Sequence, residues 1–310
     1  MSQDESRRIG LIIGREWDWP SAFMDAVNRR EAGVTAELVK LGGTFMDEAC
    51  AYDVIVDRMS HEIPYYRAFL KYAAIHNTFI INNPFTWSAD SKFFAVSMAN
   101  KLGLNSPRTV VLPNKHIEIE VVPDSFRNLT YPMDWQAIID YVGVPAIFKD
   151  NHAGGRRPAH RVSNVDELIQ RYDESGTRTK VLQQVIESDV HIHCFVVGQE
   201  NVLALRYSPA DGRYLPDIIT GDSAIGQRLS SDALRLARAY QYDVNMVEFV
   251  IKDDTVYVIN GTNPAPDMDK ELMTPEQFGW CVNEIAELAI RRAQEPLPQR
   301  AIFTLDEEAR

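Results

Sequence analysis

One hydrophobic stretch near the end of the chain constrains its fold more than any other. It runs from Met246 to Pro264 and contains two apolar runs separated by the turn-forming residues Lys252-Asp253-Asp254. Apolar runs that flank such a turn predict a β-hairpin. Each run is interrupted by a side chain with an oxygen donor, Glu248 in the first run and Asn260 or Asn263 at the end of the second.

These oxygen-bearing side chains need partners if the hairpin is buried. Burial of a carboxylate or an amide costs free energy unless another group satisfies it, and a hard divalent cation does so well. We therefore expect a Mg²⁺ site, or a Mn²⁺ site, with Glu248, Asn260 and Asn263 as ligands.

Composition excludes some classes of partner. The chain has 310 residues, of which 45% are hydrophobic and 25% are charged, so it is long enough for two or three small domains. Its 32 Lys and Arg residues are outnumbered by 44 Asp and Glu residues, and the net charge is −12. Such a chain lacks the basic footprint of a nucleic-acid-binding protein. Local cations must then bind any anionic substrate.

Cysteine usage and the hydrophobic runs predict the compartment. Cys50, Cys194 and Cys281 are odd in number and share no short spacing, which is typical of a reducing cytoplasm rather than of a disulfide framework. The first eight residues are polar and charged, and no later apolar run reaches the length of a membrane span. We expect a cytoplasmic protein without a membrane partner; a homo-oligomer stays open.

The first part of the chain alternates short strands and helices. An apolar run from Arg8 ends at Gly14, a helical pattern follows near Pro20, and later strands and a helix are predicted at 34–39, 52–56, 65–76 (the helix) and 78–82. This order predicts an α/β domain over residues 1–85. Gly10-x-x-x-Gly14 lacks the spacing of a dinucleotide-binding loop, so we interpret it as the end of a strand.

The remaining elements follow a mixed order. Helices are predicted at 89–102, 165–172, 229–240 and 275–294, and strands at 109–112, 144–149, 181–186, 191–197 and 201–207, while residues 113–141 show no clear pattern. This order favours an α+β architecture over a single doubly wound sheet. Lys149 ends one strand, and Gly154 and Gly155 follow it in a loop whose backbone amides can approach a phosphate closely.

Over roughly residues 82–266 the chain resembles ATP-grasp proteins, in the style of the glutathione synthetase and ribosomal-protein glutamate ligase branch. Five landmarks in the family's order carry the resemblance: Asp90-Ser-Lys92 followed by 102–109; Pro145 to Lys149 with its glycine loop; Leu182 to Ile186; His193 to Gly198 with a returning Arg206; and Val247-Glu-Phe249 with Asn263-Pro264.

The resemblance implies a fold of mixed α/β and α+β class. A small N-terminal α/β domain that precedes the ATP-grasp fold would occupy residues 1–85. The first lobe of the ATP-grasp fold would occupy residues 86–180, the second lobe residues 181–300, and a tail residues 301–310.

The resemblance also implies roles for individual residues. Lys92 and Lys149 would contact the phosphates and adenine of ATP, and the loop with Gly154 and Gly155 would close over them. Arg206 would steady the transferring phosphoryl group, to which its forked donors are suited. The adenine hinge would be formed by Gln183, Gln184, Val185 and Ile186. Asp189 or, alternatively, Glu187 would accept hydrogen bonds from the ribose hydroxyls.

One departure from the family pattern concerns the metal. The second metal ligand is normally a Glu two residues before an Asn, and that place holds Val258, Gly261 or, with a one-residue gap, Asn260 itself. Glu248 and the two asparagines supply one formal negative charge, which weakens Mg²⁺ binding. Asp267 or Asp269 is a candidate to compensate.

The second departure is His191-Ile-His193, which stands where relatives carry an acid and an arginine. The two histidines share one face of a strand. A zinc site formed with His152 or Cys194 is the less favoured interpretation, and contact with substrate or phosphate is the favoured one.

The activity implied by the resemblance is ATP-dependent ligation of a carboxylate to an amine. The carboxylate is phosphorylated, and the amine attacks the acyl phosphate to form an amide or peptide bond, with release of ADP and phosphate. The substrates would be a small-molecule carboxylate and amine, an amino acid or a peptide among them. The alternative, favoured by the missing acidic ligand, is a catalytically impaired relative that binds nucleotide as a regulatory or scaffolding subunit.

Overall fold

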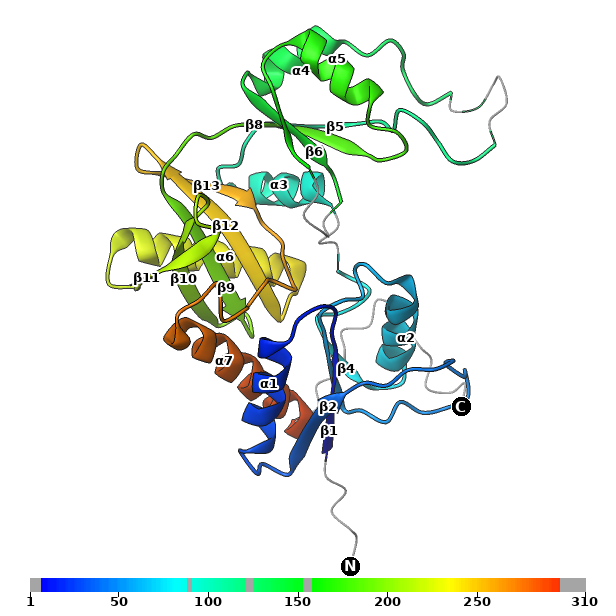
Figure 1. Cartoon of the computed structure of the whole chain (residues 1–310), viewed down its shortest axis with the longest axis vertical. Helices are drawn as coiled ribbons and strands as arrows, with labels where there is room; N and C mark the ends of the chain where they lie inside the picture. Colours follow the sequence, from blue (N-terminus) through cyan, green and yellow to red (C-terminus); the bar gives the residue numbers. More distant parts are fainter. Residues whose placement is uncertain (1–6, 88–90, 121–124, 126, 153–157, 296–310) are drawn as a thin grey trace, which may run out of the picture. The chain divides into compact units, whose positions relative to one another are not determined.

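The computed structural model describes residues 7–87, 91–120, 125, 127–152 and 158–295 (Figure 1). The contacts between residues divide the chain into two compact units. The first comprises Met1–Trp87, His191–Glu248 and Thr262–Arg310, and the second comprises Ser88–Val190 and Phe249–Gly261. The predicted boundary after residue 85 lies close to the junction at Trp87, whereas the one predicted after residue 180 falls at the start of a strand of the second unit.

The N-terminal part of the first unit is a parallel sheet with the strand order β2-β1-β3-β4. All residues of β3 and β4 are buried, as expected for a parallel sheet covered on both faces. The elements are β1 (Arg7–Ile12), α1 (Asp18–Asn28), β2 (Val34–Leu38), β3 (Val54–Asp57), α2 (Pro64–Ile75) and β4 (Phe79–Ile81).

The other strands of the first unit belong to a second sheet, with the strand order β11-β10-β9-β12-β13, of which β13 and the end of β12 fall in the second unit. Its strands β9, β10 and β11 pair antiparallel. Helix α6 contacts β9 and β10, and helix α7 packs with the opposite face. The elements are β9 (His191–Val197), β10 (Asn201–Ser208), β11 (Arg213–Ile219), α6 (Ala224–Tyr240), β12 (Val244–Lys252) and α7 (Pro275–Gln294).

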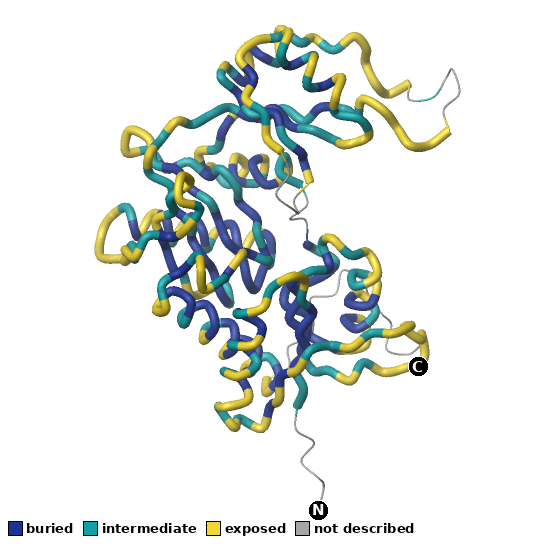
Figure 2. The backbone as a smooth tube through the Cα atoms, viewed as in Figure 1, coloured by how far each residue is buried: buried dark blue, intermediate teal, exposed yellow. Residues whose placement is uncertain are grey.

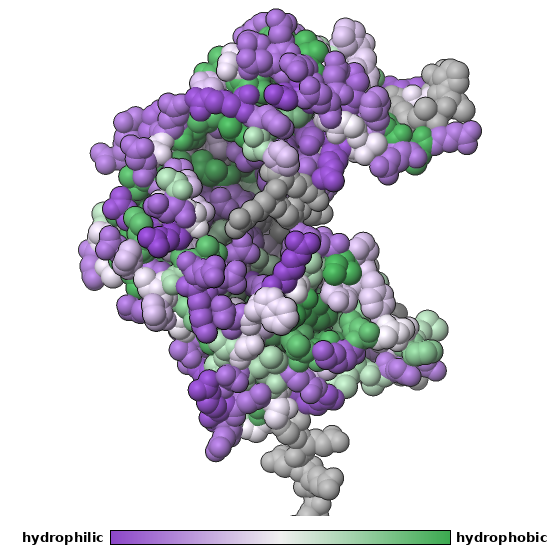
Figure 3. Space-filling view, in the orientation of Figure 1, coloured by the Kyte–Doolittle hydropathy of each residue, from purple (hydrophilic) through white to green (hydrophobic). Residues whose placement is uncertain are grey.

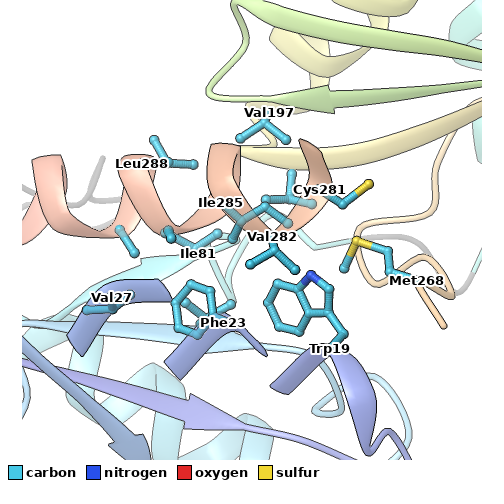
Figure 4. Packing of buried hydrophobic residues seen from close by; sticks show 14 of the residues in the cluster. Trp19, Phe23, Val27, Ile81, Val197, Met268, Cys281, Val282, Ile285 and Leu288 are labelled. Carbon is cyan, nitrogen blue, oxygen red and sulfur yellow. The ribbon is translucent and has the colours of Figure 1, made fainter. Parts of the chain in front are cut away.

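Helix α7 is central to the core of the first unit. Figure 4 shows Val282 facing Trp19 and Phe23 of α1, and Leu288 lying towards Val197 of β9. These side chains belong to one buried cluster that includes residues of both sheets. The helix is well defined at its start because Thr274 and Gln277 form a capping box before the first turn.

The second unit contains an antiparallel sheet with the strand order β5-β8-β6-β7. Helices α4 and α5 cover the face that carries Phe148 and Leu182. Helix α3 and the end of the β12–β13 hairpin complete this unit. The elements are α3 (Lys92–Lys101), β5 (Thr109–Leu112), α4 (Trp135–Val142), β6 (Ala146–Asp150), β7 (His160–Val162), α5 (Val165–Asp173), β8 (Lys180–Gln184) and β13 (Thr255–Asn260).

The strands and helices differ in how far their residues are buried. The sheet strands are largely buried, whereas the turns and the outer sides of the helices are exposed (Figure 2). Exposed apolar side chains occur near α2, including Phe45, Met46 and Ile75, and green hydrophobic residues appear there in Figure 3. Within the described residues, each helix is too short or too polar to cross a membrane.

The predicted hairpin is present. Strands β12 and β13 are joined by Asp253 and Asp254, which both have positive φ angles, of 49° and 59°. Two such residues are typical of the tight hairpin turn. Other elements differ from the prediction: α6 begins at Ala224 rather than Leu229, α4 occupies part of the 113–141 segment, and β7 and β11 were not predicted.

Candidate functional site

The predicted lysine Lys149 lies on β6 in the second unit and contacts the predicted hinge. Its Nζ donates to Oε1 of Gln183 at 2.8 Å, and Nε2 of Gln183 donates to the Thr109 hydroxyl at 3.2 Å. Pairing of Ile147 with Gln183 places Gln183 and Lys149 on the same face of the sheet, because side chains alternate along a strand. The helices α4 and α5 pack against the other face.

Lys92 begins helix α3, directly beside the end of β6. Its backbone N–H donates to the Asn151 carbonyl at 2.7 Å, and its Nζ donates to the His152 carbonyl at 2.7 Å. The Asn151 side chain accepts from the N–H of Phe93 at 3.0 Å. The strand that carries Lys149 and the helix that carries Lys92 are therefore joined by the residues 151 and 152. Gly154 and Gly155, which follow, lie outside the described residues.

The predicted hinge is split between strand and connection. Gln183 is buried and Gln184 is the last residue of β8, whereas Val185, Ile186 and the exposed Asp189 follow the strand. Gln184 points to the face opposite Gln183, and its Oε1 accepts from the Arg108 N–H at 3.2 Å. Gln183 is thus the hinge side chain that shares a face with Lys149. The alternative ribose acceptor, Glu187, pairs with Arg161 at 2.8 Å.

His193 lies on β9 in the first unit, among aromatic side chains. Its Nδ1 is 3.1 Å from the Tyr214 hydroxyl, and its ring stacks on Tyr207 with centroids 4.4 Å apart. Burial lowers the pKa of His193, the carboxylate of Glu248 raises it in part, and His191 lowers it further. The imidazole is therefore favoured in its neutral form, and Glu248 is close enough to act on it electrostatically.

Arg206 lies on the neighbouring strand but on the other side of the sheet. The register pairs Arg206 with Ile192 and Leu205 with His193. Since paired residues share a face and successive residues alternate, Arg206 and His193 lie on opposite faces. The structure does not bring these two predicted catalytic side chains together.

The predicted metal ligands fall in both units. Glu248 and Asn263 belong to the first unit, and Asn260 belongs to the second. The Asn263 carbonyl accepts from the Met246 N–H at 2.8 Å, which places this backbone two residues from Glu248. Tyr214, whose hydroxyl donates to Sδ of Met246 at 3.5 Å, has its pKa raised by burial and by Glu248.

Metal chemistry at these residues depends on oxygen donors. Among the described residues, no three His, Cys, Asp or Glu side chains gather into a group that could bind a metal ion. Mg²⁺ is commonly bound through one or two carboxylates together with substrate phosphates and water. Glu248 with asparagine oxygens fits that mode, because it leaves most of the coordination to phosphate and water.

Sequence reasoning did not identify some polar and aromatic neighbours. Thr109 contacts Gln183, and Tyr207 and Tyr214 surround His193. One sequence signal pointed to Tyr207, the alternation of side chains along a predicted strand. Tyr207 lies two residues after Leu205 and therefore on the same face, and Leu205 pairs with His193. Strand β11, which carries Tyr214, was not predicted at all.

No family model matches the sequence. A curated relative, the D-alanine–D-alanine ligase of Polynucleobacter asymbioticus, is 31% identical over 77 residues. That match covers 24% of this chain and 23% of the relative, so the chain matches about a quarter of the length of that ligase.

Solved structures match over almost the whole chain. A RimK domain ATP-grasp protein from Sphaerobacter thermophilus has a TM-score of 0.66 and 17% identity, and the match covers 91% of this chain and 99% of that chain. The ATP-grasp ligase PsnB, solved with a minimal precursor, Mg and ADP, has a TM-score of 0.60 and 14% identity, and the match covers 92% of this chain and 98% of that chain. The chain has the ATP-grasp fold, with a likeness to RimK-type proteins, as the sequence landmarks predicted.

Proposed function

We propose that the chain is an ATP-dependent carboxylate–amine ligase. The observation that carries the proposal is the contact between Lys149 and the buried Gln183, on a sheet face that α4 and α5 leave uncovered. A fixed ammonium group next to a strand end suits the binding of nucleotide phosphates. The fold and the partial sequence match to a D-alanine–D-alanine ligase support the same assignment.

Each residue has a definite task in this proposal. Lys149 and Lys92 bind phosphate oxygens, Gln183 orients Lys149, and the chain at 184–186 contacts the adenine. Glu248, Asn260 and Asn263 would hold Mg²⁺, which would neutralise phosphate charge. A carboxylate oxygen attacks the γ-phosphorus and ADP leaves; the amine then attacks the acyl carbon, phosphate leaves and the amine nitrogen loses a proton.

A substitution of Lys149 is the first test. Lys149→Met should weaken ATP binding by about tenfold or more, because a charge-assisted hydrogen bond contributes about 1.5–3 kcal/mol. Lys115→Met is the matched control: Lys115 belongs to the same unit and forms a partly exposed ion pair with Asp173. Calorimetric titration with a non-hydrolysable ATP analogue measures both. Equal affinity in the two variants would contradict the assignment of Lys149.

A second candidate function is nucleotide binding without ligation. It is favoured by His193, a neutral imidazole in an aromatic setting where the resemblance implies a charged arginine, and by the separation of His193 from Arg206. Release of ADP measured with Mg²⁺ or Mn²⁺ over a panel of amino acids and amines separates the two. Substrate-dependent release supports the ligase, and analogue binding without any release supports the second candidate.

A further inference from the structure

Thr109, Gln183 and Lys149 lie on three neighbouring strands of the second unit. Strand β8 lies between β5 and β6, and the register pairs Gln183 with Thr109 on one side and with Ile147 on the other. Paired residues share a face of the sheet, and Lys149 lies two residues beyond Ile147 on the same face. The three polar side chains therefore form a row across the sheet, on the face opposite to α4 and α5.

Each hydrogen bond in this row has a fixed direction. The Pro107 carbonyl can only accept, so the Thr109 hydroxyl, 3.0 Å away, donates its single proton to it. The Thr109 oxygen then accepts from Nε2 of Gln183 at 3.2 Å, and Oε1 of Gln183 accepts from Nζ of Lys149 at 2.8 Å. A lysine ammonium group donates and cannot accept. The two ends of the row therefore determine how the Gln183 amide is turned.

The row runs from the interior towards the surface. Thr109 and Gln183 are 9% and 4% exposed, whereas Lys149 is half-buried. If the amide were turned around, its NH₂ group would face the ammonium group, and its oxygen would face a hydroxyl whose proton is bound to the Pro107 carbonyl. Because unpaired polar groups are costly in the interior, the arrangement with Oε1 towards Lys149 is the stable one.

The side chain that accepts from Lys149 is uncharged. An amide oxygen accepts a hydrogen bond from an ammonium group without cancelling its charge, whereas a carboxylate would cancel it. The bond to Gln183 therefore directs the lysine without neutralising it. The Thr109 hydroxyl contributes by keeping the amide oxygen on the side of Lys149.

We infer that Thr109 is a positioning residue for nucleotide binding, and that it directs the Lys149 ammonium group through the Gln183 amide. The inference rests on the proposed function, because the direction of Lys149 matters only if this lysine binds phosphate. It adds a residue that acts through another side chain. All three residues belong to the second unit, so the inference concerns this unit alone.

Substitutions of Thr109 test the inference. Thr109→Val removes the hydroxyl and keeps the branched shape, and Thr109→Ser keeps the hydroxyl. Calorimetry on the full chain measures the affinity for a non-hydrolysable ATP analogue in EDTA, which removes any contribution of the metal ligands. We expect Thr109→Val to weaken binding about threefold to tenfold, as for the loss of one neutral hydrogen bond, and Thr109→Ser to bind like the unmodified chain.

A matched control comes from another strand threonine of the same unit. The Thr255 hydroxyl donates to the Asp253 carbonyl at 3.4 Å, within the β12–β13 hairpin. Thr255→Val removes a hydroxyl of the same kind outside the row, so it should leave the affinity for the analogue unchanged. Urea unfolding of each variant establishes that it is folded during the titration, and Thr109→Ala removes the same hydroxyl if the Val variant does not fold.

The Lys149→Met background separates positioning from a general structural effect. A residue that acts through Lys149 has nothing left to direct in that background, so Thr109→Val should change the affinity there by less than about twofold. An additive loss would show that the effect of Thr109 bypasses Lys149.

The outcomes separate this inference from the proposed function. Suppose that Lys149→Met weakens binding: unchanged affinity in Thr109→Val, or an equal loss in both backgrounds, then overturns the role of Thr109 alone. Unchanged affinity in Lys149→Met overturns the phosphate contact of Lys149, which carries the proposed function, and the inference falls with it.

Discussion

At the scale of single residues, His193 stands out for its burial among aromatic side chains. The imidazole is buried, contacts the Tyr214 hydroxyl and stacks on Tyr207. Burial lowers its pKa below the ordinary value of 6.5 despite the nearby Glu248. A neutral histidine can exchange protons or hydrogen-bond with a substrate but does not supply the permanent charge of an arginine.

The lowered pKa predicts how stability depends on pH. Below pH 6.5 the unfolded chain takes up a proton at this histidine before the folded chain does, so the free energy of unfolding rises with pH between the folded pKa and 6.5. His61, whose pKa burial also lowers, acts in the same direction. His193→Phe should reduce this slope. Urea unfolding at a series of pH values measures it.

Tyr207→Phe is the control for that experiment, because it keeps both the stacked ring and His193. Its slope should equal that of the unmodified chain. A titration of His193 followed by NMR gives the pKa directly; a midpoint above 6.5 would contradict the prediction.

The sequence located individual site residues unevenly. Lys149 was predicted from a strand end before a glycine loop and Gln183 from the family resemblance, and the two side chains are in contact. The grouping of His193 with Arg206 rested on the family resemblance, and strand register places the two side chains on opposite faces of the sheet. Register is set by pairing and packing over the whole sheet, so it is difficult to read from one strand alone.

At the scale of elements, turn chemistry was the most readable signal. The β12–β13 hairpin was predicted from Asp253-Asp254, and both residues have the positive φ angles that the turn requires. Helix α7 was predicted over its full length, and its capping box and Pro275 fix where it begins. Helix α4 and strand β11 were not recognised; β11 contains Pro216 and several exposed residues, which obscure the usual alternation.

The hairpin turn offers a prediction about stability. Asp254 has a φ of 59°, a conformation that costs a residue with a Cβ atom about 1 kcal/mol and costs glycine little. Asp254→Gly should therefore raise the free energy of unfolding by about 0.5–1 kcal/mol. Asp254→Val, a β-branched residue in the same turn, should lower it. Urea unfolding of both variants measures the pair; a Gly variant less stable than the Val variant would contradict the assigned turn.

At the scale of the whole molecule, the residues assigned to nucleotide and metal are divided between two units of the fold. Lys92, Lys149, Gln183 and Asn260 belong to one unit, and Glu248 and Asn263 belong to the other. Both units are discontinuous in sequence, whereas the domains were predicted as consecutive segments. Local patterns identify strands and turns, whereas the grouping of distant segments depends on packing that local patterns do not record.

The proposed roles of Glu248 and Lys149 predict how the binding of ATP depends on Mg²⁺. If Glu248 and Lys149 act on one nucleotide, Glu248→Gln should weaken binding of a non-hydrolysable ATP analogue in the presence of Mg²⁺ and leave binding in EDTA nearly unchanged, because glutamine lacks the negative charge that would hold the cation. Lys149→Met should weaken binding under both conditions. Calorimetric titrations of the two single variants and the double variant, with and without Mg²⁺, complete a thermodynamic cycle.

The coupling energy of that cycle is the informative quantity. Residues that contact one ligand through a shared phosphate and cation give losses that do not add, whereas independent sites give additive losses within about 0.5 kcal/mol. We expect non-additive losses with Mg²⁺ and additive ones without it. Additive losses under both conditions would separate Glu248 from the nucleotide, and the second unit alone would then account for ATP binding through Lys149 and Gln183.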